Sequence, residues 1–155
     1  MKLKIAAVGR IRQGPEADLI YDYSARFDRT GRALGLGPLS VVEVEAKKGG
    51  IAAEGELLSR AVSGAGVVCV LDERGRTATS PEFARLLENW RDQGRGELAF
   101  VIGGADGVAP ELRGQADFAL SLGNMVWPHM LARVMLTEQL YRAASILAGS
   151  PYHRE

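Results

Sequence analysis

The amino-acid sequence predicts an α/β domain whose largely parallel sheet is flanked by helices. Apolar runs of strand character alternate with segments of helical spacing along the whole chain, a pattern typical of parallel strands joined by crossover helices. The 155 residues contain no internal repeat, low-complexity tract or linker, which favours one domain over positions 1–155. Hydrophobic residues make up 46% and charged residues 25%, the composition of a folded rather than a disordered chain.

Five runs have the apolar, β-branched composition of buried strands. The first closes on Gly9. The third stops at Asp72 and leads into an expected turn that contains Gly75. The expected strands are residues 2–8, 39–44, 67–71, 98–102 and 118–122.

Amphipathic segments separate these runs. The third expected helix opens at Ser80, a cap-like residue that precedes Pro81 at the first helical position. A short helix is expected from Pro110. The other expected helices are residues 15–32, 51–62 and 128–147.

The last expected helix has two apolar stripes rather than one. A single stripe is enough to pack a helix on a sheet, so the second predicts contact with another helix, such as one from a second subunit. The stripes consist of Leu131, Val134 and Met135, and of Leu136, Leu140, Ala143 and Leu147.

Charge and cysteine content exclude several classes of protein. Nineteen basic residues balance nineteen acidic ones, which counts against a general nucleic-acid binder but not against an enzyme that recognises one structured RNA through a local patch. The one cysteine, Cys69, lies in an apolar run, where a buried inert thiol is favoured over a nucleophile. With one cysteine and two histidines at no ligand spacing, no metal is expected.

Apolar segments in the chain are short. The stretch of residues 5–9 is too short for a signal-peptide core, and the longest uncharged run, residues 118–132, falls short of a membrane span. We therefore expect a cytoplasmic protein that does not contact a membrane.

Candidate binding groups follow the third, fourth and fifth expected strands, because ligands of open parallel sheets collect beyond the carboxyl ends of the strands. Gly103 and Gly104 either let a ligand approach the backbone or form only a tight turn. The motif is neither the dinucleotide fingerprint nor a P-loop. The loop of residues 123–129 is unusually apolar. It is suited to an adenine ring and a thioether chain, or it is simply folded into the core.

The C-terminal tail places a phenol, an imidazole and a guanidinium in succession, as Tyr152, His153 and Arg154. By itself this pattern is also that of a solvated chain end. Glu138 and Arg142 stand four residues apart on the last helix, the spacing of an ordinary surface ion pair.

Six stretches together carry a specific pattern: residues 1–9, 70–75, 100–107, 127–134, 138–143 and 151–155. Their combination resembles the SPOUT superfamily. Within it, the chain is similar to the ribosomal RNA large-subunit methyltransferase H type, the pseudouridine N3-methyltransferases. The resemblance covers the whole chain, and the final Pro-Tyr-His-Arg-Glu is its most specific part.

The resemblance implies a C-terminal trefoil knot, a homodimer, and S-adenosylmethionine bound in the knot. Gly123, Asn124 and Val126 stand where family members often carry Ser and Thr, so backbone groups would make the hydrogen bonds there. The implied cofactor-binding residues are Leu71, Gly103, Leu122, Gly123, Asn124, Met125, Val126 and Trp127.

The implied substrate is a pseudouridine at the tip of a ribosomal RNA hairpin in the assembled ribosome. Its N3 is nucleophilic only as its proton leaves. We therefore expect His153 to accept the proton, Arg154 to stabilise charge on the base oxygens and Tyr152 to orient the extruded base. The residues expected to contact RNA or to position the tail are His129, Glu138 and Arg142.

Two other functions remain in competition with methyl transfer. One is a non-catalytic, ribosome-binding assembly factor of the same fold. An NAD-dependent oxidoreductase is disfavoured, because the dinucleotide fingerprint is missing.

Overall fold

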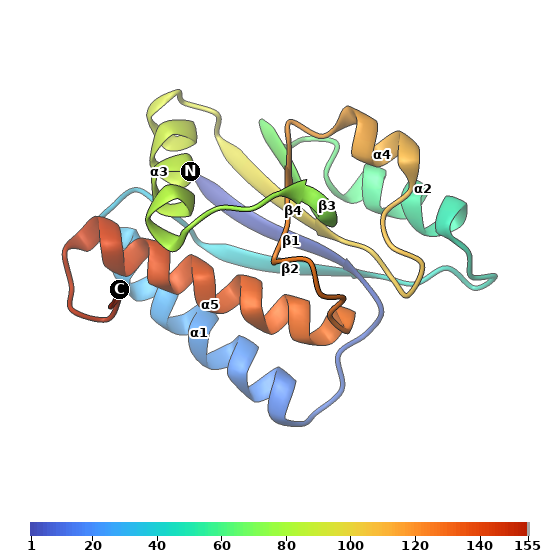
Figure 1. The fold of residues 1–155 in the computed structure, drawn as a ribbon, viewed down its shortest axis with the longest axis horizontal. Coiled ribbons are helices and arrows are strands. Elements are labelled where there is room, and N and C mark those ends of the chain that lie inside the picture. The colour runs from blue at the N-terminus through green and yellow to red at the C-terminus, as the bar shows by residue number, and fades with distance from the viewer. Residues whose placement is uncertain (155) are drawn as a thin grey trace.

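The computed structural model describes residues 1–154 as a five-stranded sheet with helices on both faces (Figure 1). The strands are β1 (Lys2–Val8), β2 (Leu39–Val44), β3 (Val67–Arg76), β4 (Glu97–Ile102) and β5 (Phe118–Leu120). The helices are α1 (Pro15–Arg32), α2 (Ile51–Ala61), α3 (Ser80–Asp92), α4 (Pro110–Gln115) and α5 (His129–Ala148). All ten elements correspond to segments predicted from sequence.

The strand order is β2-β1-β4-β3-β5, and every neighbouring pair is parallel. The prediction of a largely parallel sheet flanked by helices is therefore confirmed. All five strands point their carboxyl ends to one edge, which is where such sheets bind ligands. The C-terminal knot stays a prediction.

Alternate residues of each strand face opposite sides of the sheet and form two cores. On one side, Leu3, Ile5 and Phe100 pack against α1, α3 and α5. On the other, Ala6 and Val101 pack against α2 and α4. Figure 1 shows α1 and α5 on one side of the sheet and α2 and α4 on the other.

Cys69 belongs to the first core, as expected of an inert thiol. Burial raises the pKa of its thiol to about 12, so the side chain carries no thiolate near neutral pH.

Two element boundaries differ from the sequence prediction. The expected turn after Asp72 is instead a continuation of β3 to Arg76, with a register shift against β5 between Leu71 and Arg76. Gly75 allows this continuation, because a Cβ there would lie 2.5 Å from the Ala119 carbonyl oxygen. β5 ends at Leu120, two residues early.

The cap of α3 is Thr79, so the expectation of Ser80 was wrong. The Thr79 hydroxyl accepts from the Glu82 N–H, and the Glu82 carboxylate accepts from the Thr79 N–H, which forms a capping box. The Ser80 hydroxyl instead donates to Gln139 Oε1 at 2.7 Å and so joins α3 to α5.

The two apolar stripes of α5 have different environments. Leu136, Leu140 and Ala143 are completely buried within one chain, between the sheet and the neighbouring helices. In the other stripe Leu131 is 40% exposed, whereas Val134 is buried. Of this stripe, Leu131 is thus the exposed residue that another subunit could contact.

Candidate functional site: a cavity at the carboxyl edge of the sheet

A cavity of about 300 Å³ lies at the carboxyl edge of the sheet. The ends of β3, β4 and β5 contribute to it, together with the segment that leads from β5 into α5. Its lining residues are Leu71, Asp72, Glu73, Arg74, Ile102, Gly103, Gly104, Ala105, Asp106, Gly107, Val108, Leu120, Leu122, Gly123, Met125, Val126, Trp127, His129 and Ala132. Three strand ends that are distant in sequence thus meet in one place, as the parallel topology requires.

Seven of the eight residues predicted to bind the cofactor line this cavity: Leu71, Gly103, Leu122, Gly123, Met125, Val126 and Trp127. Asn124 is exposed and does not line it. Met125 and Val126 are 72% and 79% exposed, so the segment of residues 123–127 is an open wall rather than part of the core.

Gly103 is needed for a tight turn. A Cβ at Gly103 would lie 2.2 Å from the carbonyl oxygen of Gly107 and 2.9 Å from the nitrogen of Val108. The missing side chain therefore lets the loop of residues 103–108 fold on itself. Gly103 also lines the cavity, so its contact with a cofactor stays a prediction.

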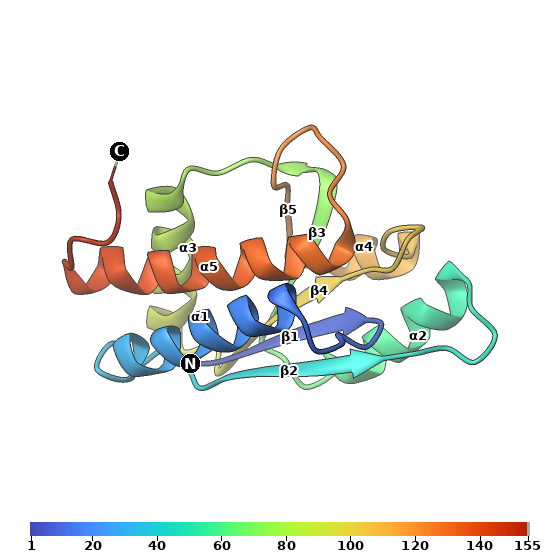
Figure 2. The same cartoon turned by 90° about the horizontal axis from the view of Figure 1, so that it is seen from below.

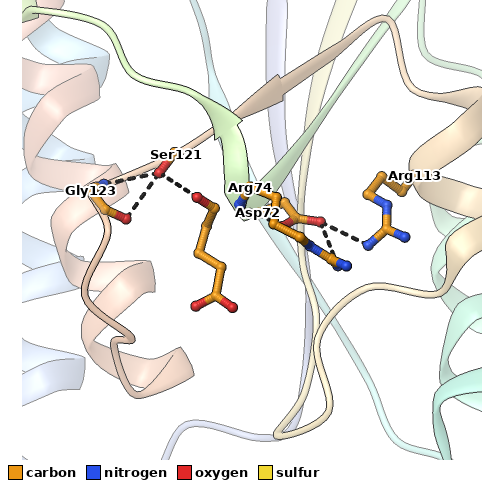
Figure 3. A network of polar contacts seen from close by, with 6 residues as sticks. Asp72, Arg74, Arg113, Ser121 and Gly123 are labelled. Atoms are coloured by element: carbon orange, nitrogen blue, oxygen red, sulfur yellow. Dashed lines mark hydrogen bonds and ion pairs between the residues drawn. The ribbon is translucent and has the colours of Figure 1, made fainter.

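Ser121 organises the cavity wall and was not found by sequence reasoning. Its buried hydroxyl lies 3.1 Å from the Glu73 carbonyl oxygen and 3.0 Å from that of Gly123, and it accepts from the Gly123 N–H at 3.1 Å (Figure 3). These contacts tie the extended end of β3 to the wall segment. A serine directly after an apolar strand is too common a feature to have signalled this.

Asp72 forms a second polar cluster on the cavity wall. Its side chain is only 5% exposed and accepts from Arg74 Nε and from Arg113 Nη1, both at 3.1 Å (Figure 3). One carboxylate thus joins β3 to α4 behind the cavity. Arg113 lies 41 residues away in sequence, so no local pattern links the two.

The N-terminal end of α5 is held by a buried ion pair. Arg133 is fully buried, and its Nη1 lies 2.6 Å from Glu43 Oε2 while Nη2 donates to the Gly9 carbonyl oxygen at 3.1 Å. His129, one turn earlier, lines the cavity, and its Nδ1 is buried without a partner among residues 1–154. Arg133 was not identified as a site residue from sequence.

The tail packs at the opposite end of α5 (Figure 2). Glu138 Oε1 accepts from Tyr152 Oη at 2.8 Å and from Arg142 Nη2 at 2.6 Å. Arg142 Nη1 lies 3.2 Å from His153 Nδ1, and its guanidinium stacks 4.8 Å above the Tyr152 ring. The predicted pair Glu138 and Arg142 thus contacts the tail, whereas Arg154 is exposed. Glu155 lies outside the described residues.

These contacts define the chemical state of the tail. Burial and the hydrogen bond to Glu138 raise the pKa of Tyr152 well above its ordinary value, so this residue stays a neutral phenol. Arg142 can only donate, so Nδ1 of His153 accepts and the ring proton lies on Nε2.

The structure does not bring the tail to the cavity of its own chain, since no tail residue lines it. Along α5, His129 and Ala132 border the cavity, whereas Glu138 and Arg142 contact the tail. The thirteen residue steps from His129 to Arg142 span roughly 20 Å, and the six from Ala132 to Glu138 roughly 9 Å. The predicted catalytic and cofactor-binding residues therefore form two separate groups along α5.

Neither a metal centre nor a membrane segment is seen in the described part of the chain. No group of three or more His, Cys, Asp or Glu side chains within residues 1–154 could hold a metal ion. Among the helices of the same range, none is long and apolar enough to cross a membrane.

Comparisons with known proteins agree with this architecture. A family model described as "Predicted SPOUT methyltransferase" matches residues 1–153. Proteins named ribosomal RNA large subunit methyltransferase H from Roseobacter denitrificans and Dinoroseobacter shibae are 68% and 66% identical to the chain. Each match covers 99% of both sequences.

Solved structures support the fold alone, because their sequence identity is low. A probable methylase family protein from Haemophilus influenzae has a TM-score of 0.57 at 15% identity and covers 99% of this chain and 70% of its own. A probable methyltransferase from Bordetella pertussis has a TM-score of 0.55 at 12% identity, with 92% and 96% covered.

The parallel sheet with a cavity at its carboxyl edge, together with the family model that matches residues 1–153, defines an α/β protein of the methyltransferase class. More narrowly, the chain belongs to the SPOUT methyltransferase family. The family predicted from the six sequence stretches is thereby confirmed.

Proposed function

We propose that this protein transfers a methyl group from S-adenosylmethionine to N3 of a pseudouridine in large-subunit ribosomal RNA, within the assembled ribosome. The full-length match to relatives named ribosomal RNA large subunit methyltransferase H carries this proposal. The cavity at the carboxyl edge of the sheet supports it, and a ribosomal substrate places the enzyme in the cytoplasm.

The cavity suits the proposed cofactor in its chemistry. Leu71, Leu122 and Trp127 offer apolar walls for an adenine ring and a thioether chain. The backbone around Gly103 and Gly123 offers N–H and C=O groups for the polar edge of the adenine. When bound, S-adenosylmethionine supplies an electrophilic methyl group on a sulfonium sulfur.

The tail is proposed to act on the cavity of a second subunit, in a homodimer. Within one chain no tail residue lines the cavity, so a second copy is the proposed source of the tail for a composite site. Exposed Leu131 of α5 and exposed Leu19 of α1 offer apolar side chains for that copy.

In the proposed mechanism the tail prepares the target base. Tyr152 orients the extruded ring; its hydroxyl is engaged with Glu138, and Arg142 stacks on its ring. The Arg154 guanidinium stabilises negative charge on the base oxygens as the N3 proton leaves. The cavity residues Leu71, Leu122 and Trp127 would hold the cofactor so that N3 could take its methyl group in place of the sulfur.

His153 is proposed to take part in removing that proton. In the arrangement described here its Nε2–H is a donor that is buried without a partner among residues 1–154, so the tail must shift before this group can reach a base oxygen. It can accept the N3 proton only after the contact with Arg142 breaks or the ring tautomer changes. A His153→Gln variant keeps the donor but cannot take up a proton, so it distinguishes these two roles.

Methyl transfer to ribosomes tests the proposal directly. The protein is incubated with methyl-labelled S-adenosylmethionine and unmodified ribosomes, and the labelled nucleotide is identified by mass spectrometry. Label in a pseudouridine of the large-subunit RNA is expected. Ribosome binding without methyl incorporation would instead favour the assembly factor.

A variant of the open cavity wall tests the cofactor site. Val126→Asp places a carboxylate on an exposed wall residue, so the fold should persist while affinity for S-adenosylmethionine falls about tenfold or more. The matched control is Val41→Asp, the same change at an exposed valine of β2 outside the cavity. Calorimetry that gives both variants wild-type affinity would contradict the assignment.

A further inference from the structure

Four exposed basic side chains lie on two loops that leave the same end of the sheet. We call this group the basic edge: Arg10 and Arg12 after β1, and Lys47 and Lys48 after β2. The loops lie side by side because β1 and β2 are parallel neighbours, as Figures 1 and 2 both show. For a chain of zero net charge, this is a local concentration of positive charge.

The structure leaves this charge largely uncompensated. None of the four side chains has an ion-pair partner within the described residues 1–154. Glu43 feels the charge of Arg10, which helps to lower its pKa, but its close contacts are with other groups: its Oε2 accepts from the Ile11 N–H at 2.6 Å and pairs with buried Arg133. Glu45 is the one carboxylate within the two loops.

The same contacts hold the basic edge in place. The Ile11 bond to Glu43 fixes the middle of the first loop, and the Gly9 N–H donates to the Val44 carbonyl oxygen at 2.9 Å. Arg133 connects both loops to α5 through Glu43 and the Gly9 carbonyl oxygen. The buried Arg133 thus pairs with the Glu43 carboxylate and anchors the loop that displays the cations.

The basic edge borders the proposed cofactor cavity. Gly9, which precedes Arg10, lies against His129: a Cβ at Gly9 would be 3.5 Å from His129 Cε1. His129 in turn lines the cavity. A nucleic acid whose target base enters the cavity would therefore have its flanking backbone close to Arg10 and Arg12.

We infer that the basic edge binds the phosphate backbone of the RNA next to the target nucleotide. This inference rests on the proposed function and adds to it the surface that holds the substrate. Exposed Arg and Lys side chains without carboxylate partners are the groups that bind phosphates through counterion release. An overall neutral protein can hold RNA in this way because the charge is local.

The test replaces Arg10, Arg12, Lys47 and Lys48 together by Gln. The control replaces the same number of exposed cations elsewhere by Gln: Arg29, Arg32, Arg60 and Arg85. Both variants lose four charges, so only position distinguishes them. Circular dichroism and calorimetry with S-adenosylmethionine verify folding and cofactor affinity, which should equal those of the wild type.

The readouts are the KM for ribosomes and the salt dependence of ribosome binding. The basic-edge variant should raise KM about tenfold or more. It should also lower the slope of log K against log salt by about 3, since each lost phosphate contact removes roughly 0.7–0.9. The control variant should change neither quantity appreciably.

Two results would overturn the inference: wild-type KM and salt slope in the basic-edge variant, or equal losses in both variants. Failure of the proposed function has a different signature. If the wild type binds ribosomes but transfers no methyl group, methylation is refuted, while the binding comparison still tests the basic edge.

Discussion

Arg133 is the largest fully buried side chain of the protein. A buried guanidinium is costly unless its charge is paired and its N–H groups are bonded. Glu43 and the Gly9 carbonyl oxygen provide this compensation for the two terminal nitrogens, from β2 and from the end of β1, whereas Nε is buried without a partner among residues 1–154. The pair is asymmetric, because the Arg133 side chain is 1% exposed and the Glu43 side chain is 29% exposed.

This asymmetry predicts unequal effects of removing either partner. Glu43→Ala leaves a buried, unpaired cation and should lower the free energy of unfolding by about 3 kcal/mol. Arg133→Met keeps the volume and leaves a carboxylate that water can reach, so it should cost clearly less. Urea unfolding measures both. Equal losses, or a greater loss for Arg133→Met, would contradict the account.

The same pair predicts how stability changes in acid. Burial alone would raise the pKa of Glu43, but the hydrogen bonds from Arg133 and the Ile11 N–H and the charge of Arg133 together hold it below its ordinary value of 4.5. Glu43 therefore contributes stability that is present above pH 4.5 and is lost as the pH falls through its lowered pKa. The unfolding free-energy difference between wild type and Glu43→Gln should shrink over that range. A constant difference would refute the coupling.

Helix α5 combines several tasks along one length. Its first turns border the cavity and carry Arg133, its middle is buried in the sheet-facing core, and its last turns hold the tail. A helix with these tasks needs apolar residues on more than one side, which explains its two stripes.

The two stripes predict different consequences of the same substitution. Leu140→Ala creates a cavity at a fully buried position and should destabilise the chain by about 2–5 kcal/mol. Leu131→Ala, at a 40% exposed position, should change the unfolding of the monomer little but weaken self-association. Chemical denaturation and light scattering separate these effects. A stable monomer for the wild type at micromolar concentration would overturn the dimer.

At the scale of the whole molecule, the cavity and the tail lie at different positions along α5 (Figure 2). No residue of the tail lines the cavity of its own chain. The proposed homodimer removes this conflict by letting each tail serve the cavity of the other subunit.

Subunit mixing tests this arrangement. Deletion of residues 152–155 should leave folding and cofactor affinity intact, since these depend on the sheet and α5, but lower methylation by orders of magnitude. Val126→Asp should be inactive through its cavity. Mixed dimers join an intact tail to an intact cavity, so activity should partly return. No recovery despite demonstrated subunit exchange would argue that the tail acts within its own subunit.

The sequence alone determined the parallel α/β class and the position of the cavity. The strand periodicity indicates which residues are buried. Parallel strands end at one edge of the sheet, so the proximity of the residues after β3, β4 and β5 could be predicted from the sequence. The family could also be predicted from the sequence, because its motifs are contiguous stretches of residues.

Only the tertiary structure decided which distant groups meet. Glu43 and Arg133 are 90 residues apart. β3 continues past Asp72 because β5 pairs with it. Thr79 rather than Ser80 caps α3, because the Ser80 hydroxyl bonds Gln139. Local patterns carry no information about such partners, since they depend on how elements pack. The same reason explains why the tail, which is specific as a motif, could not be placed from sequence at the end of α5 away from the cavity.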